Sequence, residues 1–413
     1  MKAVTHKTGL YNIKQYLFKL KQKIMKKSLI LCAALLACAF SFQSCDKVDN
    51  PTGEPLNPTE AAIDNGTELA DAVKNFAKEG VLEIPANVVE LYVSENIDLS
   101  EIEVKAENLT LLAAKGIEIK IGKPMTNVSI IGDATKPATI IAKEGFVSNG
   151  SIAIMNVNID FTEEANASLI TIKDVKGKKA LKADGSDSPY TILDLIDIEG
   201  VKVSGLKKSL IESTAGKILF TKINVINSIV EVCGNVNVFA LGGGFPENLL
   251  IEESTIWSNG VHKNFFFKAD GKPADVTSET TTTWTVNQST LVNIAIGKKA
   301  NNSNGGIKGK KTTIMNLKNS ILYNFGSNKG NEVNGWLWGQ NGGAIANYEN
   351  NTYWSEDGAV EGWTDSGKGG SDQTETALTT DPAFTDAANG IFKPAGDEQV
   401  AKKTGDPRWY NAN

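Results

Sequence analysis

Histidine and arginine are scarce in this chain of 413 residues, which limits the chemistry that it offers. His262 is the only histidine after residue 6, and Arg408 is the only arginine. A histidine-rich metal site needs several such side chains, and a catalytic triad would have to use His262 alone. Because His262 lies close to three consecutive phenylalanines at 265–267, we predict that it belongs to a loop or to the core. We therefore predict neither a histidine-rich metal site nor a catalytic triad.

Cysteine is equally limiting. The chain has four cysteines, and only Cys233 follows Cys45. A disulfide framework after residue 44 is therefore excluded unless Cys45 is free to pair. Cys233 lies within an apolar alternation over residues 229–239, where we predict a buried, unreactive thiol.

The N-terminal region has the pattern of a secreted lipoprotein. Basic residues follow Met25, residues 29–42 form an apolar run too short to stay as a membrane span, and Cys45 comes directly after. We predict that residues 1–44 are a signal peptide with an upstream extension, because Met25 is a better start than Met1. An acylated Cys45 would then hold the protein at a membrane by lipid alone. The alternative is conventional cleavage with Cys45 free.

Acidic residues dominate the rest of the chain. The first 44 residues hold eight of the 42 basic residues and none of the 48 acidic ones, so residues 45–413 carry a net charge of about −14. A surface of this sign repels nucleic acid and anionic lipid. We therefore expect no nucleic-acid partner.

The remaining sequence changes character three times. Residues 45–60 are rich in proline, asparagine and acid and predict a lipidated tether. Residues 67–78 predict a helix that Thr67 caps and Gly80 ends. Short runs of alternating apolar residues then extend to about residue 356, so we assign 61–356 to a β domain. Residues 357–413 predict a polar loop and a C-terminal cap over the final coil, anchored by Phe384, Phe392 and Trp409.

A repeated pattern indicates how these strands are arranged. Two polar residues, a hydroxyl and two apolar residues recur at positions equivalent to Ser228, Thr255, Thr290, Ser320 and Thr352, in steps of 27, 35, 30 and 32 residues. Stacked coils with loops of different length give such an irregular period. The pattern predicts an all-β solenoid, a parallel β-helix. A sandwich or barrel is the competing all-β architecture.

Motifs at both ends of the domain are similar to known families. TELADAV at 67–73, GVLEIP at 80–85 and LTLL at 109–112 resemble the opening of pectate-lyase-like right-handed β-helix domains, in which a capping helix leads to the first strand. DPAF at 381–384 and GDPRW at 405–409 resemble the ending of uncharacterised β-helix lipoproteins of Gram-negative gut anaerobes, often encoded near polysaccharide-utilisation genes. This resemblance implies a right-handed β-helix that is lipid-anchored at the outer membrane, on the cell surface, and linked to glycans, but it implies no reaction.

Catalytic side chains are hard to place on this pattern. Polysaccharide lyases of this fold use a basic side chain, commonly arginine, with calcium held by carboxylates, whereas hydrolases use two spaced carboxylates. The only arginine lies in the expected cap, and no lysine stands out. Pairs such as Asp194 with Asp197, or Glu252 with Glu253, most simply face water on alternating strands. No catalytic residue and no cofactor is predicted, and calcium enters only if the protein is a lyase.

Tryptophan is the feature that suggests binding. All seven tryptophans follow residue 256. A flat indole suits the apolar face of a sugar ring, and it also suits a solenoid core. We predict core positions for Trp257, Trp284 and Trp354, which lie within the repeat. Candidate glycan contacts, which lie among glycine and polar residues, are Trp336, Trp338 and Trp363.

The leading hypothesis is a lipid-anchored, monomeric surface β-helix that binds or presents at complex polysaccharide without cleaving it. One alternative is a calcium-dependent polysaccharide lyase with a lysine base. A second alternative is a structural or adhesion surface protein, because one solenoid hosts all three functions.

Overall fold

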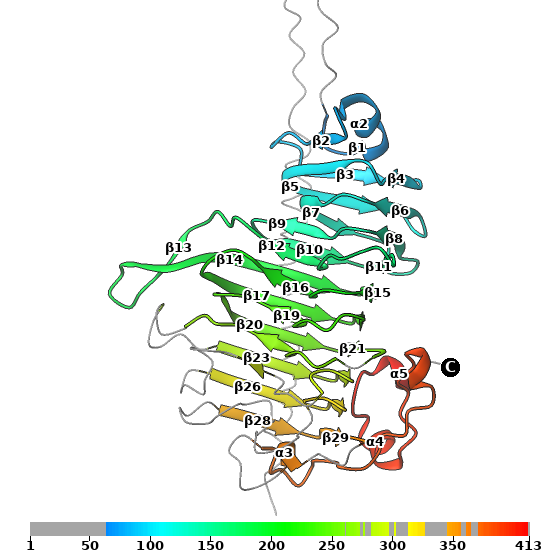
Figure 1. The fold of residues 1–413 in the computed structure, drawn as a ribbon, viewed down its shortest axis with the longest axis vertical. Coiled ribbons are helices and arrows are strands. Elements are labelled where there is room, and N and C mark those ends of the chain that lie inside the picture. Colours follow the sequence, from blue (N-terminus) through cyan, green and yellow to red (C-terminus); the bar gives the residue numbers. More distant parts are fainter. Residues whose placement is uncertain are drawn as a thin grey trace, which may run out of the picture. The chain divides into compact units, whose positions relative to one another are not determined.

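The chain divides into two units, residues 1–61 and 62–413, and all described residues belong to the second unit. The computed structural model describes residues 63–260, 262–272, 276, 282–296, 301–302, 313–326, 345–356, 361–364 and 371–411. Within this unit short strands stack coil upon coil (Figure 1). The predicted all-β parallel β-helix is confirmed.

A 19-stranded sheet forms two sides of the coils. Its longer column begins beside β1 (Thr67–Glu68) and contains β3 (Glu90–Val93), β5 (Glu103–Ala113), β7 (Met125–Ile131), β10 (Ile152–Met155), β14 (Asp187–Glu199), β17 (Ile218–Ile226), β20 (Phe245–Glu252), β23 (Thr282–Asn287), β26 (Thr313–Lys318) and β28 (Ile345–Glu349). Its shorter column joins β5 and β7 and contains β2 (Val81–Glu83), β9 (Phe146–Ser148), β12 (Ile170–Ile172), β16 (Ile211–Ser213), β19 (Phe239–Ala240), β22 (Phe267–Lys268) and β25 (Asn301–Asn302).

A ten-stranded sheet forms the remaining side. Its strands are β4 (Ile97–Leu99), β6 (Glu118–Ile121), β8 (Ala138–Ala142), β11 (Val157–Phe161), β15 (Lys202–Leu206), β18 (Ile229–Val232), β21 (Thr255–Trp257), β24 (Thr290–Val292), β27 (Ile321–Tyr323) and β29 (Thr352–Trp354). Neighbouring strands in this sheet are parallel. Among the described strands, the exception to parallel pairing is β13 (Lys179–Leu181), which forms an antiparallel hairpin with β14 and projects from the stack in Figure 1.

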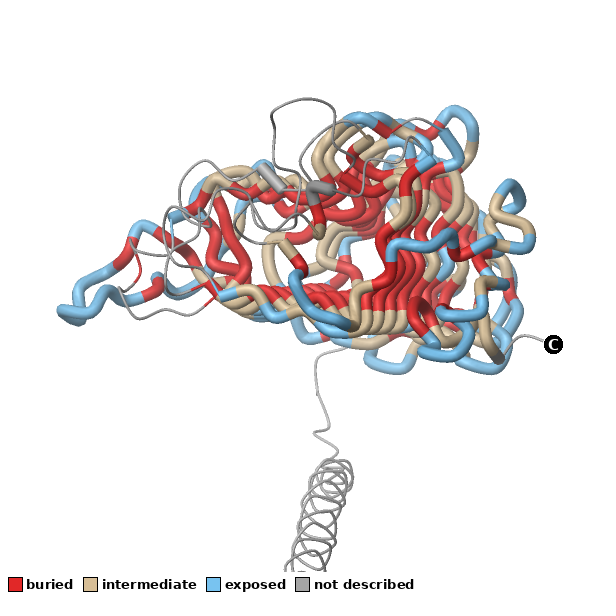
Figure 2. The backbone as a smooth tube through the Cα atoms, turned by 90° about the horizontal axis from the view of Figure 1, so that it is seen from below, coloured by how far each residue is buried: buried red, intermediate tan, exposed pale blue. Residues whose placement is uncertain are grey.

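Alternate side chains of each strand point into the coils and form the core. Figure 2 looks along the stack and shows the buried residues along the inside. In the ten-stranded sheet, from β6 to β29, one inward position per coil is apolar and at most 1% exposed. Its successive occupants are Ile119, Ile140, Ile159, Val203, Val230, Ile256, Leu291, Leu322 and Tyr353. Burial of apolar surface stabilises the fold by about 25 cal/mol per Å² removed from water, and it is the main contribution to the stability of the stack.

A single residue in the left-handed conformation joins the longer column to the ten-stranded sheet in successive coils. Asparagine and glycine adopt this conformation at little cost, and Glu and Gln occupy it in two coils. These residues, with φ between 46° and 64°, are Asn156, Gly200, Asn227, Glu253, Gln288, Asn319 and Asn350.

A buried polar ladder follows this turn. Its members are fully buried, and each side-chain oxygen accepts the backbone N–H of the preceding coil at 3.1–3.3 Å. They are Ser228, Ser254, Ser289, Ser320 and Asn351. The predicted equivalence of Ser228 and Ser320 with Thr255, Thr290 and Thr352 is therefore wrong by one residue. In the strand pairing, Ile229 and Ile321 occupy the threonine position, because hydroxyl and β-branched apolar side chains both fit there.

Helix α2 (Leu69–Phe76) covers the first coil and buries Leu69 and Ala72. It is shorter than the 67–78 predicted. Thr67 does not cap it, because Thr67 and Glu68 pair with β3 as strand β1. The carboxylate of Glu68 instead accepts the N–H of Ser94 at 3.2 Å.

In the described residues after the last strand there are four short helical segments: α3 (Glu361–Thr364), the 3-10 helix η2 (Ala387–Asn389), α4 (Asp397–Lys402) and α5 (Arg408–Asn411). We call residues 371–411 the cap. Figure 1 shows most of the cap beside the later coils, at the right of the stack. In the part of the chain that is described, no helix is both long and apolar enough to cross a membrane.

Candidate functional site

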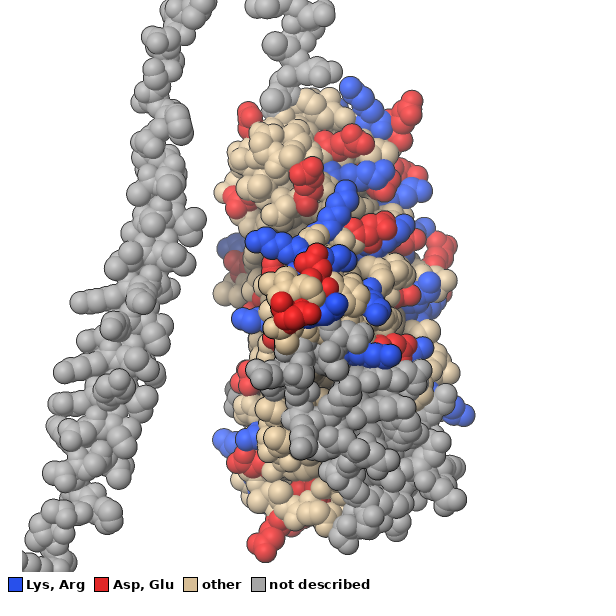
Figure 3. Space-filling view, turned by 90° about the vertical axis from the view of Figure 1, so that its left-hand side faces the viewer, with Lys and Arg blue, Asp and Glu red and all other residues tan. Residues whose placement is uncertain are grey.

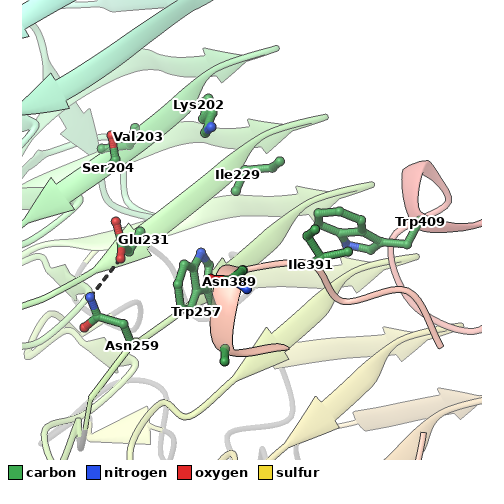
Figure 4. Close-up of a pocket in the computed structure, with 12 residues that line it drawn as sticks. Lys202, Val203, Ser204, Ile229, Glu231, Trp257, Asn259, Asn389, Ile391 and Trp409 are labelled. Atoms are coloured by element: carbon green, nitrogen blue, oxygen red, sulfur yellow. Dashed lines mark hydrogen bonds between the residues drawn. The ribbon is translucent and has the colours of Figure 1, made fainter. Parts of the chain in front are cut away.

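A pocket of about 440 Å³ lies where the outer face of the ten-stranded sheet meets the cap (Figure 4). This volume is in the range that small-molecule sites occupy. Strands β15, β18 and β21 form its floor, and η2 with the residues on either side of it forms a wall. The lining residues are Lys202, Val203, Ser204, Ile229, Glu231, Trp257, Asn259, Ala388, Asn389, Gly390, Ile391 and Trp409.

The strand register explains why chemically different side chains meet on this floor. Outward positions of successive strands lie side by side, so Glu231 of β18 is the direct neighbour of Trp257 of β21. Lys202 and Ile229 are neighbours in the same way in the adjacent row. The pocket therefore combines a cation, a carboxylate and an indole within three coils.

Glu231 is held in place by its neighbours. One carboxylate oxygen accepts the amide of Asn259 at 2.8 Å, and the other accepts the backbone N–H of Gly205 at 3.2 Å. A bulge in the pairing of β15 with β18 allows the Gly205 contact. On the next coil towards the N-terminus, Ser204 donates its hydroxyl to Asp160. The polar part of the floor is thus a preformed hydrogen-bond network.

Trp257 is half-buried between the floor and the wall. Its ring packs edge-on against Phe392, with 5.4 Å between ring centroids. Gly390 has φ +74°, and a Cβ there would come within 2.8 Å of the indole, so glycine allows the wall to approach closely. Figure 4 shows Trp257 beside Asn389 of the wall, and Ile391 closer to Trp409.

Trp409 lies farther along the same wall and is anchored to the sheet. Its indole N–H donates to the hydroxyl of Thr255 at 2.9 Å, and that hydroxyl donates to Asp406 at 2.8 Å. Asp406 is 1% exposed and pairs with Arg408 at 2.8 Å. Burial raises the pKa of Asp406, although Arg408 and the hydrogen-bond donors oppose that shift.

Cys233 lies next to this site, and its predicted burial is wrong. It is exposed, because Val232 takes the inward position at the end of β18 and the next residue points outward. Partial desolvation of the sulfur, and then the charge of Glu231, raise the pKa of the Cys233 thiol. Asn259 contacts the sulfur at 3.6 Å.

The predicted tryptophan positions are only partly reproduced. Trp284 is fully buried in the core, as predicted, but Trp257 and Trp354 are only half-buried, so their core prediction is wrong. Trp363 is 3% exposed, stacks on Tyr353 at 5.3 Å and donates to the carbonyl of Phe325. The ring of Trp363 is therefore not accessible to a ligand in this structure. Trp336, Trp338 and Cys45 lie outside the described residues.

The carboxylate pairs do not converge on a site. Asp194 is exposed, and Asp197 accepts a hydrogen bond from Asn224 in the next coil. Glu252 accepts from Asn287, while Glu253 occupies the left-handed turn. Among the described residues, no group of three or more His, Cys, Asp or Glu side chains is placed to hold a metal ion.

His262 has a structural place between coils. It is 1% exposed, its Nδ1 accepts the N–H of Ala295 at 3.1 Å, and its Nε2 lies 2.6 Å from the carbonyl of Val236. Nε2 therefore carries the proton and donates it. Burial lowers the pKa of His262, which favours this neutral form.

The cap residues that form the pocket wall lie within a region that matches a family model. Residues 284–409 match the model of a domain of unknown function (DUF5123). The match begins in β23 and ends at Trp409, so it covers the later coils and the pocket wall. Lys202, Glu231 and Trp257 of the floor precede it. Comparisons with curated proteins and with solved structures found no match.

The sequence pattern does not predict Lys202, Glu231 and Ile391 as site residues. Glu231 and Trp257 occupy the same outward position of consecutive repeats, and an alignment on the correct register brings them together. Nothing in the local sequence places Ile391 beside them, because it reaches the floor only when the cap folds back.

Proposed function

We propose that this protein binds complex polysaccharide in the pocket between the ten-stranded sheet and the cap, and does not cleave it. The observation that carries the proposal is Trp257, which is half-buried and lies beside Glu231 in a pocket that Asn259 and Lys202 also line. An indole packs against the apolar face of a sugar ring, while a fixed carboxylate and amide hydrogen-bond its hydroxyls. Lys202 adds a positive charge that suits a uronate or sulfate substituent.

The setting of this site is part of the proposal. The pattern at residues 25–45 supports a protein anchored at the outer membrane by a lipid on Cys45, with residues 46–60 as a tether to the cell surface. The parallel β-helix agrees with the resemblance to pectate-lyase-like surface lipoproteins of polysaccharide-utilisation loci, which is the lineage that we propose. Trp336 and Trp338 stay candidate contacts.

The test is binding of the full chain to a panel of polysaccharides by affinity electrophoresis and calorimetry. The panel contains pectin, arabinoxylan, alginate, chondroitin sulfate and starch. We expect Trp257→Ala to weaken binding about tenfold or more, because truncation of a central aromatic anchor costs about 2 kcal/mol. Trp354→Ala is the matched control, since Trp354 is also half-buried and lies in the same outward row, outside the pocket.

Two results would overturn the proposal. Binding to no member of the panel would favour a structural or adhesion protein, and equal losses in both tryptophan variants would move the binding site elsewhere. Lys202 on the floor also favours a second candidate, a lyase with a lysine base. Unsaturated uronide absorbance that accumulates with pectin or alginate, and disappears in Lys202→Ala and on calcium chelation, would support the lyase.

A further inference from the structure

One outward row of the ten-stranded sheet changes abruptly from open to covered. Asn158 and Ile229 are half-exposed and Lys202 is exposed. The positions that continue this row, Thr255, Thr290, Ile321 and Thr352, are all fully buried. The boundary between Ile229 and Thr255 runs through the pocket floor.

Residues 404–409, which we call the strap, cover the buried part of the row. The strap crosses the coils in order, from the last towards the pocket. The hydroxyl of Thr404 meets that of Thr352 at 3.1 Å, and the N–H of Asp406 donates to the hydroxyl of Thr290 at 3.0 Å. The strap therefore occupies the face on which a ligand would otherwise continue along the stack.

The strap is firmly seated. Gly405 has φ +94°, donates its N–H to the carbonyl of Asn319 at 2.7 Å, and a Cβ there would come within 2.9 Å of Ile321. The guanidinium of Arg408 donates to the carbonyl of Glu253 at 2.9 Å. A sugar chain cannot pass beneath residues held at this distance from the sheet.

We propose that the pocket binds the end of a polysaccharide chain and not its middle. This inference rests on the proposed function and adds the part of the polymer that is recognised. The terminal ring packs on Trp257 and stops against Ile391 and Trp409. The rest of the chain leaves over Lys202 and Asn158, where the sheet is open towards the N-terminal coils.

Charge does not direct the chain onto the face of the stack that Figure 3 shows. On the face shown in Figure 3, lysines and acidic residues are interleaved over the described coils. That face therefore offers no single-sign track for an anionic polymer. The geometric stop at the strap is what selects the chain end.

The test compares intact polysaccharides of the same panel with samples that sonication has shortened to about one tenth of their mean length. At equal mass the shortened sample holds about ten times as many ends, so its apparent affinity per mass rises about tenfold. A site that reads internal units gives equal affinity per mass, and that result would overturn end recognition while the proposed function stands. Binding by neither sample would instead overturn the proposed function.

A pair of cap variants tests the wall itself. Ile391 and Val400 are both exposed β-branched residues of the cap, 41% and 44% exposed, and only Ile391 lines the pocket. We expect Ile391→Ala to weaken binding of the shortened chains about fivefold, since loss of an interface contact worth about 1 kcal/mol has that effect. Val400→Ala should leave it unchanged. Equal affinities of the two variants would contradict a stop at this wall.

Discussion

Removal of one hydroxyl from the buried polar ladder gives the sharpest test of the fold. The hydroxyl of Ser289 accepts the N–H of Ser254 at 3.3 Å and donates to the carbonyl of Asn287 at 2.8 Å. Ser289→Ala removes both bonds and leaves the N–H of Ser254 buried without a partner. An unsatisfied buried donor costs about 1–3 kcal/mol, and the small apolar gain of a methyl group does not offset it. We therefore expect a loss of about 2 kcal/mol.

The assay is chemical denaturation together with amide hydrogen exchange at Ser254. Ser94→Ala is the control, because Ser94 is exposed and such surface changes stay within about 0.5 kcal/mol. In a solenoid each coil contacts mainly its neighbours, so exchange should accelerate most near β21 and β24. If Ser289→Ala matched the control in both measurements, the ladder would not stabilise the stack as we argue.

Three further predictions concern the cap and the pocket. Asp406 has a raised pKa, so its carboxylate takes up a proton at higher pH in the folded protein than in the unfolded chain. The stability that this difference contributes is fully present below pH 3.8, and it is lost as the pH rises through the pKa of the folded state. The melting temperature relative to Asp406→Asn should therefore fall as the pH rises above 3.8, and a rise would show that the pair with Arg408 outweighs burial. Gly405→Ala should lower the free energy of unfolding by about 1–3 kcal/mol in denaturation experiments, because of φ +94° and the crowding against Thr290; an unchanged midpoint would contradict a seated strap. Cys233 should react with a disulfide reagent at neutral pH more slowly than free cysteine, measured as the difference from Cys233→Ser, and faster reaction would contradict its raised pKa.

The sequence was sufficient to predict the coils because periodicity reflects burial directly. Inward positions such as Ile159 and Val230 must be apolar, and their alternation with polar neighbours is visible without coordinates. The predicted register of the repeats is wrong by one residue. Serine in the ladder and threonine at the next position are both small and hydroxylated, so composition alone does not distinguish Ser320 from Thr352 as equivalents of Thr290.

The site depended on contacts that are distant in sequence. Thr255 and Asp406 are joined by a hydrogen bond across 151 residues, and no local pattern predicts that pairing. The sequence predicts the cap over the final coil, but the strap runs back along the side of the stack to β21. The repeat predicts a core position for Trp257, yet Trp257 points outward from its strand and lies on the face that the cap only partly covers.

A crystal structure of the protein with the shortened form of its best-binding polysaccharide tests the central claim most directly. We predict a terminal sugar ring on the indole of Trp257, hydrogen-bonded to Glu231 or Asn259 and in contact with Ile391, with the next unit over Lys202. Sugar density on any other face of the coils, with this pocket unchanged, would contradict the account.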